Sequence, residues 1–118
     1  MKLEGEQVLL RMHVSNFVKW HSGPLYLALV TRARKQHLAG ATVLSGVYGY
    51  ADRGRVLGEH LNAFQVERPV VIEIVDQEEK LREFLDAAQP MLEGHHVLVT
   101  LERAHVVHYR GGQPEAVS

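Results

Sequence analysis

Glycine and arginine residues cluster between positions 40 and 55, and together they could hold an anion. The first half of this stretch is rich in β-branched and aromatic residues, which predicts a strand. Gly46, Gly49 and Gly54 then leave bare backbone that can turn or lie against a ligand. Arg53 and Arg55 lie in the same segment and add positive charge. An anion bound at the end of a sheet needs both bare backbone and positive charge. The alternative is a glycine-relieved strand end with solvated arginines.

The eight histidines invite a metal-site interpretation. His95 and His96 are adjacent, and His105 and His108 are three positions apart. In strands, both spacings place the two side chains on opposite faces, so neither pair chelates one ion alone. Surface or edge-strand histidines are the favoured interpretation, and no metal site is predicted.

Catalytic motifs are absent from the sequence. The chain has no cysteine, Ser45 lacks a Gly-x-Ser-x-Gly setting, and there is no phosphate-binding Gly-x-x-x-x-Gly-Lys-Ser/Thr motif. Glu73 stands inside an apolar strand, where a raised pKa would suit a general acid. The favoured alternative is a carboxylate paired with an arginine across the sheet or pointing into a subunit interface. We therefore predict no catalytic residue and no enzyme.

Length and composition bound the class of protein. The 118 residues, with 46% hydrophobic and 23% charged residues, predict one soluble domain over 1–118, with loose tails at 1–6 and 111–118. A net charge of −1 argues against a general nucleic-acid binder. No apolar run approaches the roughly 18 residues of a membrane span, and a cytoplasmic location is the default expectation.

The hydrophobic pattern predicts two strand–helix–strand units. The first has a strand at 7–14, a helix that opens at Pro24 and ends at Gly40, and a strand over 40–50. The second has a strand at 69–76, a helix capped by Asp76 with Glu79 in a capping box, and a strand at 96–101. Pro90 is expected to bend or end that helix. A short extra strand is predicted at 104–109.

Two such units predict an α+β, ferredoxin-like βαβ-βαβ sandwich with both helices on one face of the sheet. The connection over 51–68 is too long and too apolar for a plain linker, which favours a functional loop, with a helical turn around 57–64. The strands at 7–14 and 69–76 carry bulky apolar residues on both faces. The face without helices therefore needs cover, and oligomerisation is the expected solution.

The chain resembles the PII-like superfamily, and more closely the bacterial family called domain of unknown function 190. The resemblance covers nearly the whole chain. It is carried by Leu10-Arg11, Gly23-Pro24-Leu25-Tyr26, Leu38-Ala39-Gly40-Ala41-Thr42-Val43, Gly46, Gly49-Tyr50, Arg55-Val56, Pro69-Val70-Val71-Ile72-Glu73-Ile74-Val75-Asp76 and Val99-Thr100-Leu101-Glu102.

The resemblance implies a homotrimer with a PII-like fold and an adenine-nucleotide effector (ATP, ADP or AMP) between adjacent subunits, at the base of the long loop. Gly94 and His95 fall where PII proteins have Gly-Lys, and their two late arginines fall on Val106 and His108. These losses favour a less charged ligand, such as a nucleoside monophosphate or a cyclic dinucleotide. The predicted effector-binding residues are Thr42, Gly49, Tyr50, Arg53, Arg55, Gly94, His95 and His108.

The resemblance also implies a non-enzymatic regulator whose 51–68 loop acts on a protein target, with a membrane transporter or channel as the expected class. The alternative is a metal-responsive trimer resembling the divalent-cation-tolerance proteins, which share this fold.

Overall fold

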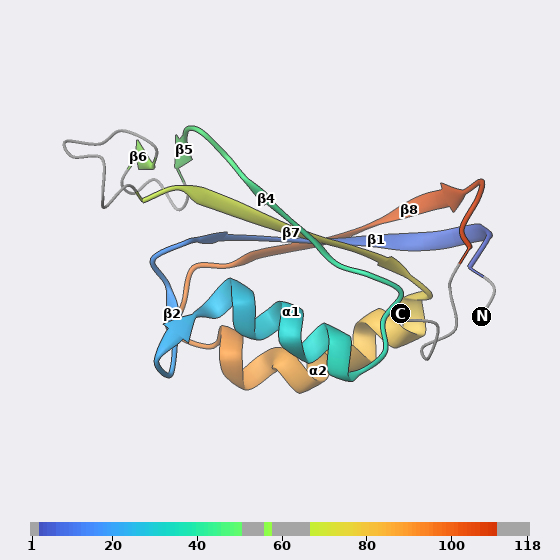
Figure 1. The fold of residues 1–118 in the computed structure, drawn as a ribbon, viewed down its shortest axis with the longest axis horizontal. Coiled ribbons are helices and arrows are strands. Elements are labelled where there is room, and N and C mark those ends of the chain that lie inside the picture. Colours follow the sequence, from blue (N-terminus) through green and yellow to red (C-terminus); the bar gives the residue numbers. More distant parts are fainter. Residues whose placement is uncertain (1–2, 51–55, 58–66, 111–118) are drawn as a thin grey trace, which may run out of the picture.

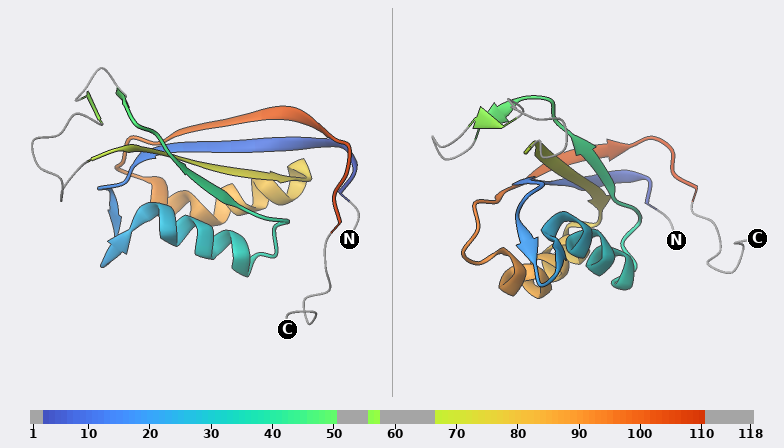
Figure 2. Two further views of the ribbon diagram at one scale, coloured as in Figure 1. Left: turned by 45° about the horizontal axis from the view of Figure 1, so that its top comes forward. Right: turned by 60° about the vertical axis from the view of Figure 1, so that its left-hand side comes forward.

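The computed structural model describes residues 3–50, 56–57 and 67–110. Four antiparallel strands form one sheet in the order β4-β7-β1-β8, and both helices lie against the same face (Figures 1 and 2). Two short strand pairs flank the sheet, β2 with β3 and β5 with β6. The elements are β1 (Gly5–Ser15), β2 (Lys19–Trp20), β3 (Gly23–Pro24), α1 (Leu25–Lys35), β4 (Thr42–Ser45), β5 (Gly49–Tyr50), β6 (Val56–Leu57), β7 (Pro69–Asp76), α2 (Glu78–Leu92) and β8 (Leu98–Val106). This architecture confirms the α+β, ferredoxin-like expectation.

A single core fills the space between the sheet and the helices. Alternate residues of β1 and β7 face the helices, because successive side chains of a strand point to opposite sides. The two helices meet them with apolar residues at helical spacing. The buried core comprises Leu10, Met12, Val14, Ile72, Ile74, Leu25, Leu29, Ala33, Leu81, Phe84, Ala88 and Met91.

The first helix ends earlier than the sequence predicted. α1 stops at Lys35, and His37 takes the left-handed conformation, with φ of 60°. The amide N–H of His37 donates to the carbonyl of Arg34 (3.0 Å), and that of Leu38 donates to the carbonyl of Ala33 (3.1 Å). This is a Schellman ending, in which a glycine usually occupies the place of His37. The assignment of Gly40 as the helix-ending glycine was therefore wrong.

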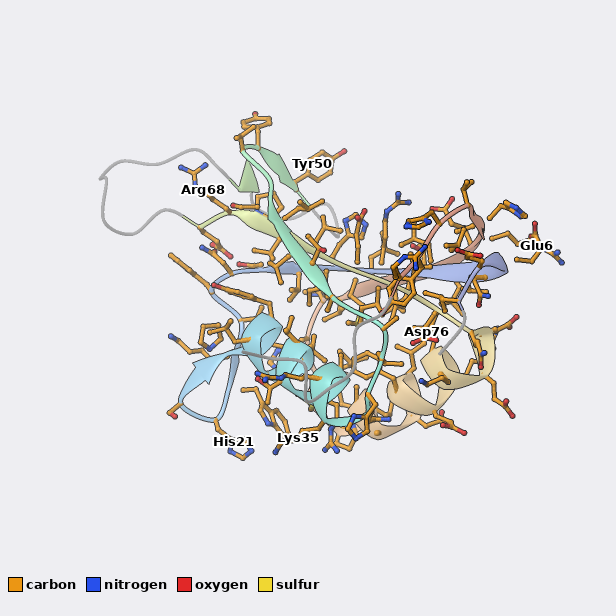
Figure 3. All side chains as sticks on the ribbon, turned by 45° about the vertical axis from the view of Figure 1, so that its right-hand side comes forward. Glu6, His21, Lys35, Tyr50, Arg68 and Asp76 are labelled. Atoms are coloured by element: carbon orange, nitrogen blue, oxygen red, sulfur yellow. The ribbon has the colours of Figure 1, made fainter. Side chains whose placement is uncertain are left out.

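Asp76 does not cap the second helix, contrary to prediction. The cap residue is Gln77, without a side-chain cap hydrogen bond, so the predicted capping box with Glu79 does not form. Asp76 is instead 0% exposed and accepts hydrogen bonds from the amides of Ala39 (2.8 Å) and Gln77 (2.7 Å). It thereby joins the connection after α1 to the junction between β7 and α2 (Figure 3).

Several predicted boundaries change. α2 runs through Pro90 to Leu92, and β8 is one strand over Leu98–Val106 in place of two separate strands. Leu57, where a helical turn was expected, pairs as a strand with Gly49. Of the predicted tails, 1–2 and 111–118 lie outside the described residues, whereas Leu3 is buried and β1 already begins at Gly5.

Within the described residues, neither helix has the length and apolar character required to span a membrane.

Candidate functional site

A charged row crosses the centre of the sheet face that no helix covers. Arg11 of β1 lies opposite Glu73 of β7, and its Nε–H donates to Glu73 Oε2 at 2.9 Å. Arg11 Nη1 also contacts the carboxylate of Glu102 on β8. The hydrogen bond to Glu73 and the charges of both carboxylates raise the pKa of Arg11 above its ordinary value. The pairing of Glu73 with an arginine across the sheet, favoured from the sequence, is confirmed.

Apolar side chains border this row on the same face. Leu44 pairs with Val71 in register, and Leu98 pairs with His13. Leu44 and Leu98 are 48% and 59% exposed in the single chain. The face therefore combines ion-paired side chains with uncovered leucines, a composition typical of a surface that packs against protein.

The predicted effector-binding residues divide between opposite edges of the sheet. Gly49 and Tyr50 follow β4 at one edge, whereas Gly94 and His95 precede β8 at the other edge. β4 and β1 run in the same direction, and β7 and β8 run against them, so β4 ends where β7 and β8 begin. All four residues thus lie at one end of the sheet, which we call the loop end, but β7 and β1 separate the two pairs.

The other predicted residues are not brought to this end. Thr42 pairs with Glu73 further along β4. His108 follows β8 at its far end, where its Nδ1 is 3.9 Å from Glu4 Oε2. β8 is nine residues long, or roughly 30 Å, so one chain cannot present His95 and His108 to the same nucleotide. Arg53 and Arg55 lie outside the described residues.

Backbone geometry accounts for Gly46 and Gly94 without a ligand. A Cβ at Gly46 would stand 2.8 Å from Pro69 Cγ, so the approach of β7 requires glycine there. Gly94 has φ of 82°, in the left-handed region that favours glycine. Gly49 has neither constraint, since a Cβ there would meet Pro69 only at an ordinary 3.5 Å. Gly49 therefore remains a candidate for direct contact between bare backbone and a ligand.

The loop end also contains an anchor that sequence reasoning missed. The amide of Asn16 donates to the carbonyl of Arg68 (3.1 Å), and the amide of Arg68 donates to Asn16 Oδ1 (2.9 Å). Ser15 Oγ contacts the carboxylate of Glu67. These bonds fix the chain just before β7, on the same side of the molecule as Tyr50 (Figure 3). Asn16 and Arg68 are far apart in the sequence, and no local pattern links them.

Metal-binding clusters do not form in the part of the chain that the structure describes: no three His, Cys, Asp or Glu side chains converge there. His105 Nδ1 instead lies 2.8 Å from Glu6 Oε2 in an exposed pair across β1 and β8.

Solved structures share this arrangement. One is CPII, a nitrogen regulatory PII-like protein from Thiomonas intermedia K12, bound to ADP, AMP and bicarbonate; its TM-score is 0.66 at 18% identity, over 87% of this chain and 90% of that chain. Another is a PII-like signaling protein from Thermus thermophilus, with a TM-score of 0.62 at 19% identity, over 91% of this chain and 94% of that chain. The fold is that of the PII-like class.

The family model DUF190, described as "Uncharacterized ACR, COG1993", matches residues 7–106. A UPF0166 protein of Aquifex aeolicus (strain VF5) is 34% identical over 100 residues, which cover 85% of this chain and 92% of that protein. The chain therefore belongs to the DUF190 family.

Proposed function

We propose that this chain is a non-enzymatic PII-like regulator that assembles as a homotrimer and binds an adenine nucleotide in clefts between subunits. The observation that carries the proposal is the division of the predicted site between opposite sheet edges. Gly49 and Tyr50 lie at the β4 edge and Gly94 and His95 at the β8 edge, all at the loop end. Two neighbouring copies that bring unlike edges together would complete one site.

The uncovered sheet face supports the oligomeric part of the proposal. Arg11 is already paired there with Glu73 and Glu102, so burial against another copy would not leave its charge unmatched. Leu44 and Leu98 would lose their exposure to water in the same step. A trimer is the assembly that the family resemblance implies.

Each part of the proposed site has a distinct role. Gly49 offers backbone N–H to an anionic group, Tyr50 offers an aromatic ring to a base, and Arg53 and Arg55 supply charge. His95 adds a polar contact from the neighbouring copy. The CPII protein with this fold is bound to ADP and AMP, which makes AMP and ADP the first ligands to test.

Ligand binding would change the 51–68 loop and thereby its contact with a protein target. Glu67 and Arg68 are held at the end of β1 by Ser15 and Asn16, so the loop has a fixed exit next to the proposed site. A membrane transporter or channel as the target is part of this proposal and rests on the family resemblance.

The experiment is calorimetric titration of ATP, ADP, AMP and cyclic dinucleotides into the full chain, with its mass measured by light scattering. Tyr50→Ala and His95→Ala should each lose binding while the oligomer persists. When the two variants are mixed and reassembled, some clefts combine an intact Tyr50 with an intact His95, and partial binding should return.

The matched control is His105→Ala, since this histidine is exposed on β8 and pairs with Glu6 at the other end of the strand. The His105→Ala variant should bind nucleotide with the same affinity as the parent chain. A monomer in dilute solution, or a nucleotide affinity unaffected by either Tyr50→Ala or His95→Ala, contradicts the proposal.

A further inference from the structure

The two helices carry opposite charges on their outer surfaces. α1 has no acidic residue, and its exposed bases form the α1 cationic patch: Arg32, Arg34 and Lys35. Of the four exposed carboxylates of α2, Glu78 pairs with Arg82, and the other three form the α2 anionic patch: Glu79, Glu83 and Asp86. No side chain of either patch has an ion-pair or hydrogen-bond partner among the described residues. Six formal charges on one layer are thus unmatched within that part of the chain.

The α2 anionic patch places like charges at repelling distances along its helix. Glu79 and Glu83 are four residues apart, and Glu83 and Asp86 are three apart; both spacings bring side chains together on a helix surface. The helix dipole favours Glu79 in the first turn of α2 but does not reach Asp86. A cationic partner from outside the chain would relieve this repulsion.

The patches lie next to each other on the outer side of the helical layer. Lys80 Nζ, in the first turn of α2, donates to the carbonyl of His37, just after α1, at 3.1 Å. The end of α1 therefore adjoins the start of α2, and Lys35 lies on the side of the layer away from the sheet (Figure 3). The surface of α2 on the anionic side is open and only slightly hollowed, and Glu78, Glu79, Arg82, Glu83 and Asp86 line it.

From this juxtaposition we infer that the helical layer docks a second copy of itself. A twofold axis in the plane of the contact, parallel to the layer and running between the patches, sets the α1 cationic patch of each copy on the α2 anionic patch of the other. Such an isologous contact satisfies both patches at once and closes on itself. Leu27, 51% exposed and two turns before Arg34 on α1, adds an apolar contact.

A second copy fits better than other occupants. An anionic membrane would use only the α1 cationic patch and would be repelled by the adjacent carboxylates. A basic partner would use only the α2 anionic patch and would be repelled by the adjacent α1 cationic patch. Only a surface with both signs side by side matches this layer, and the chain itself carries one. This contact lies on the opposite side of the molecule from the sheet face that the proposed trimer would use.

The test is sedimentation velocity of the full chain at about 20 mM and about 500 mM salt, since screening weakens contacts between exposed charges. We expect a species twice the mass of the basal oligomer, or larger, at low salt, and its loss at high salt. Two charge-reversed variants are then measured in the same way. One carries Arg32→Glu, Arg34→Glu and Lys35→Glu. The other carries Glu79→Lys, Glu83→Lys and Asp86→Lys. Each alone should associate at least about tenfold more weakly.

The decisive arm mixes the two reversed chains. One then carries only negative patches and the other only positive ones, so the mixture should regain the association that each has lost. Lys19→Glu and Glu93→Lys, charge reversals on exposed residues outside the patches, should change nothing. If a triple variant fails to fold by circular dichroism, the single reversals Arg34→Glu and Glu83→Lys replace it in the same mixing experiment.

Several results would overturn the inference. These are the absence of a larger species at low salt, association that is insensitive to both reversals, and a mixture that stays apart. Binding of the α1 cationic patch to anionic vesicles without self-association would assign the patch to a membrane instead. None of these outcomes depends on nucleotide binding, so this inference and the proposed function can fail separately.

Discussion

Arg11 and Glu73 face each other across β1 and β7, with 2.9 Å between Nε and Oε2, at the centre of the sheet face that no helix covers. Glu102 approaches the same guanidinium from β8. The pair is therefore part of a row that spans three strands. The row lies on a face that also exposes Leu44 and Leu98.

Replacing Arg11 by Met should lower the melting temperature, because two carboxylates would then share the row without a cation. Glu73→Gln should reduce the effect of Arg11→Met when the two are combined in a double-mutant cycle. Thermal melting followed by circular dichroism, at one fixed protein concentration, measures the melting temperatures and hence the coupling between Arg11 and Glu73. Additive effects of the two substitutions would show that the pair is not coupled.

The same pair predicts a flat pH dependence. The folded state raises the pKa of Arg11, and a group with a raised pKa contributes its stability at all pH values below its unfolded value. That value is already far above neutrality. The difference in melting temperature between the parent and Arg11→Met should therefore be equal at about pH 7 and about pH 9. If the difference in melting temperature is smaller at about pH 9 than at about pH 7, Arg11 is not the source of this stability.

Asp76 should be the most costly polar residue to replace. Asp76→Leu leaves the amides of Ala39 and Gln77 without an acceptor in a buried place, which should lower the free energy of unfolding by about 2–4 kcal/mol. Asp76→Asn keeps one acceptor oxygen and should cost about 1 kcal/mol. Urea unfolding measures both. Lys80→Met is the control, since the partly exposed ion pair at 3.9 Å should contribute under about 1 kcal/mol.

His37→Gly should stabilise the chain by about 0.5–1 kcal/mol, since His37 holds φ of 60° at the end of α1, where glycine has no steric penalty. Gln36→Gly provides the matched control one residue earlier. With φ of −89° it should destabilise by about 1 kcal/mol through lost backbone restriction. Equal effects at the two positions would show that the left-handed conformation carries no strain.

Gly46→Ala should destabilise the junction of β4 with β7 by about 1–3 kcal/mol. The added methyl group would stand 2.8 Å from Pro69 Cγ and 3.3 Å from the Pro69 carbonyl, which accepts the Gly46 amide at 2.7 Å. Gly40→Ala has open space around it and should change stability by less than about 0.5 kcal/mol. Similar losses in urea unfolding for both variants would contradict the role of this close approach.

The sequence by itself determined the layers of this protein. Alternation of apolar and polar residues in 7–14 and the nearly continuous apolar run in 69–76 predicted two core strands, and the helical spacing of Leu25, Leu29 and Ala33 predicted the helix surface that packs on them. It also anticipated the arginine partner of Glu73. These features could be predicted because periodicity within a short window reports which face of an element is buried.

Tertiary structure alone decided where those elements meet. The local sequence predicts Asp76 as a helix cap, but its carboxylate also accepts a hydrogen bond from the amide of Ala39, 37 residues away. The left-handed ending at His37 depends on how the chain turns toward β4. The separation of Tyr50 from His95 follows from the order β4-β7-β1-β8. Strand order and chain reversal depend on contacts between distant segments, and such contacts leave no periodic signal in a local window.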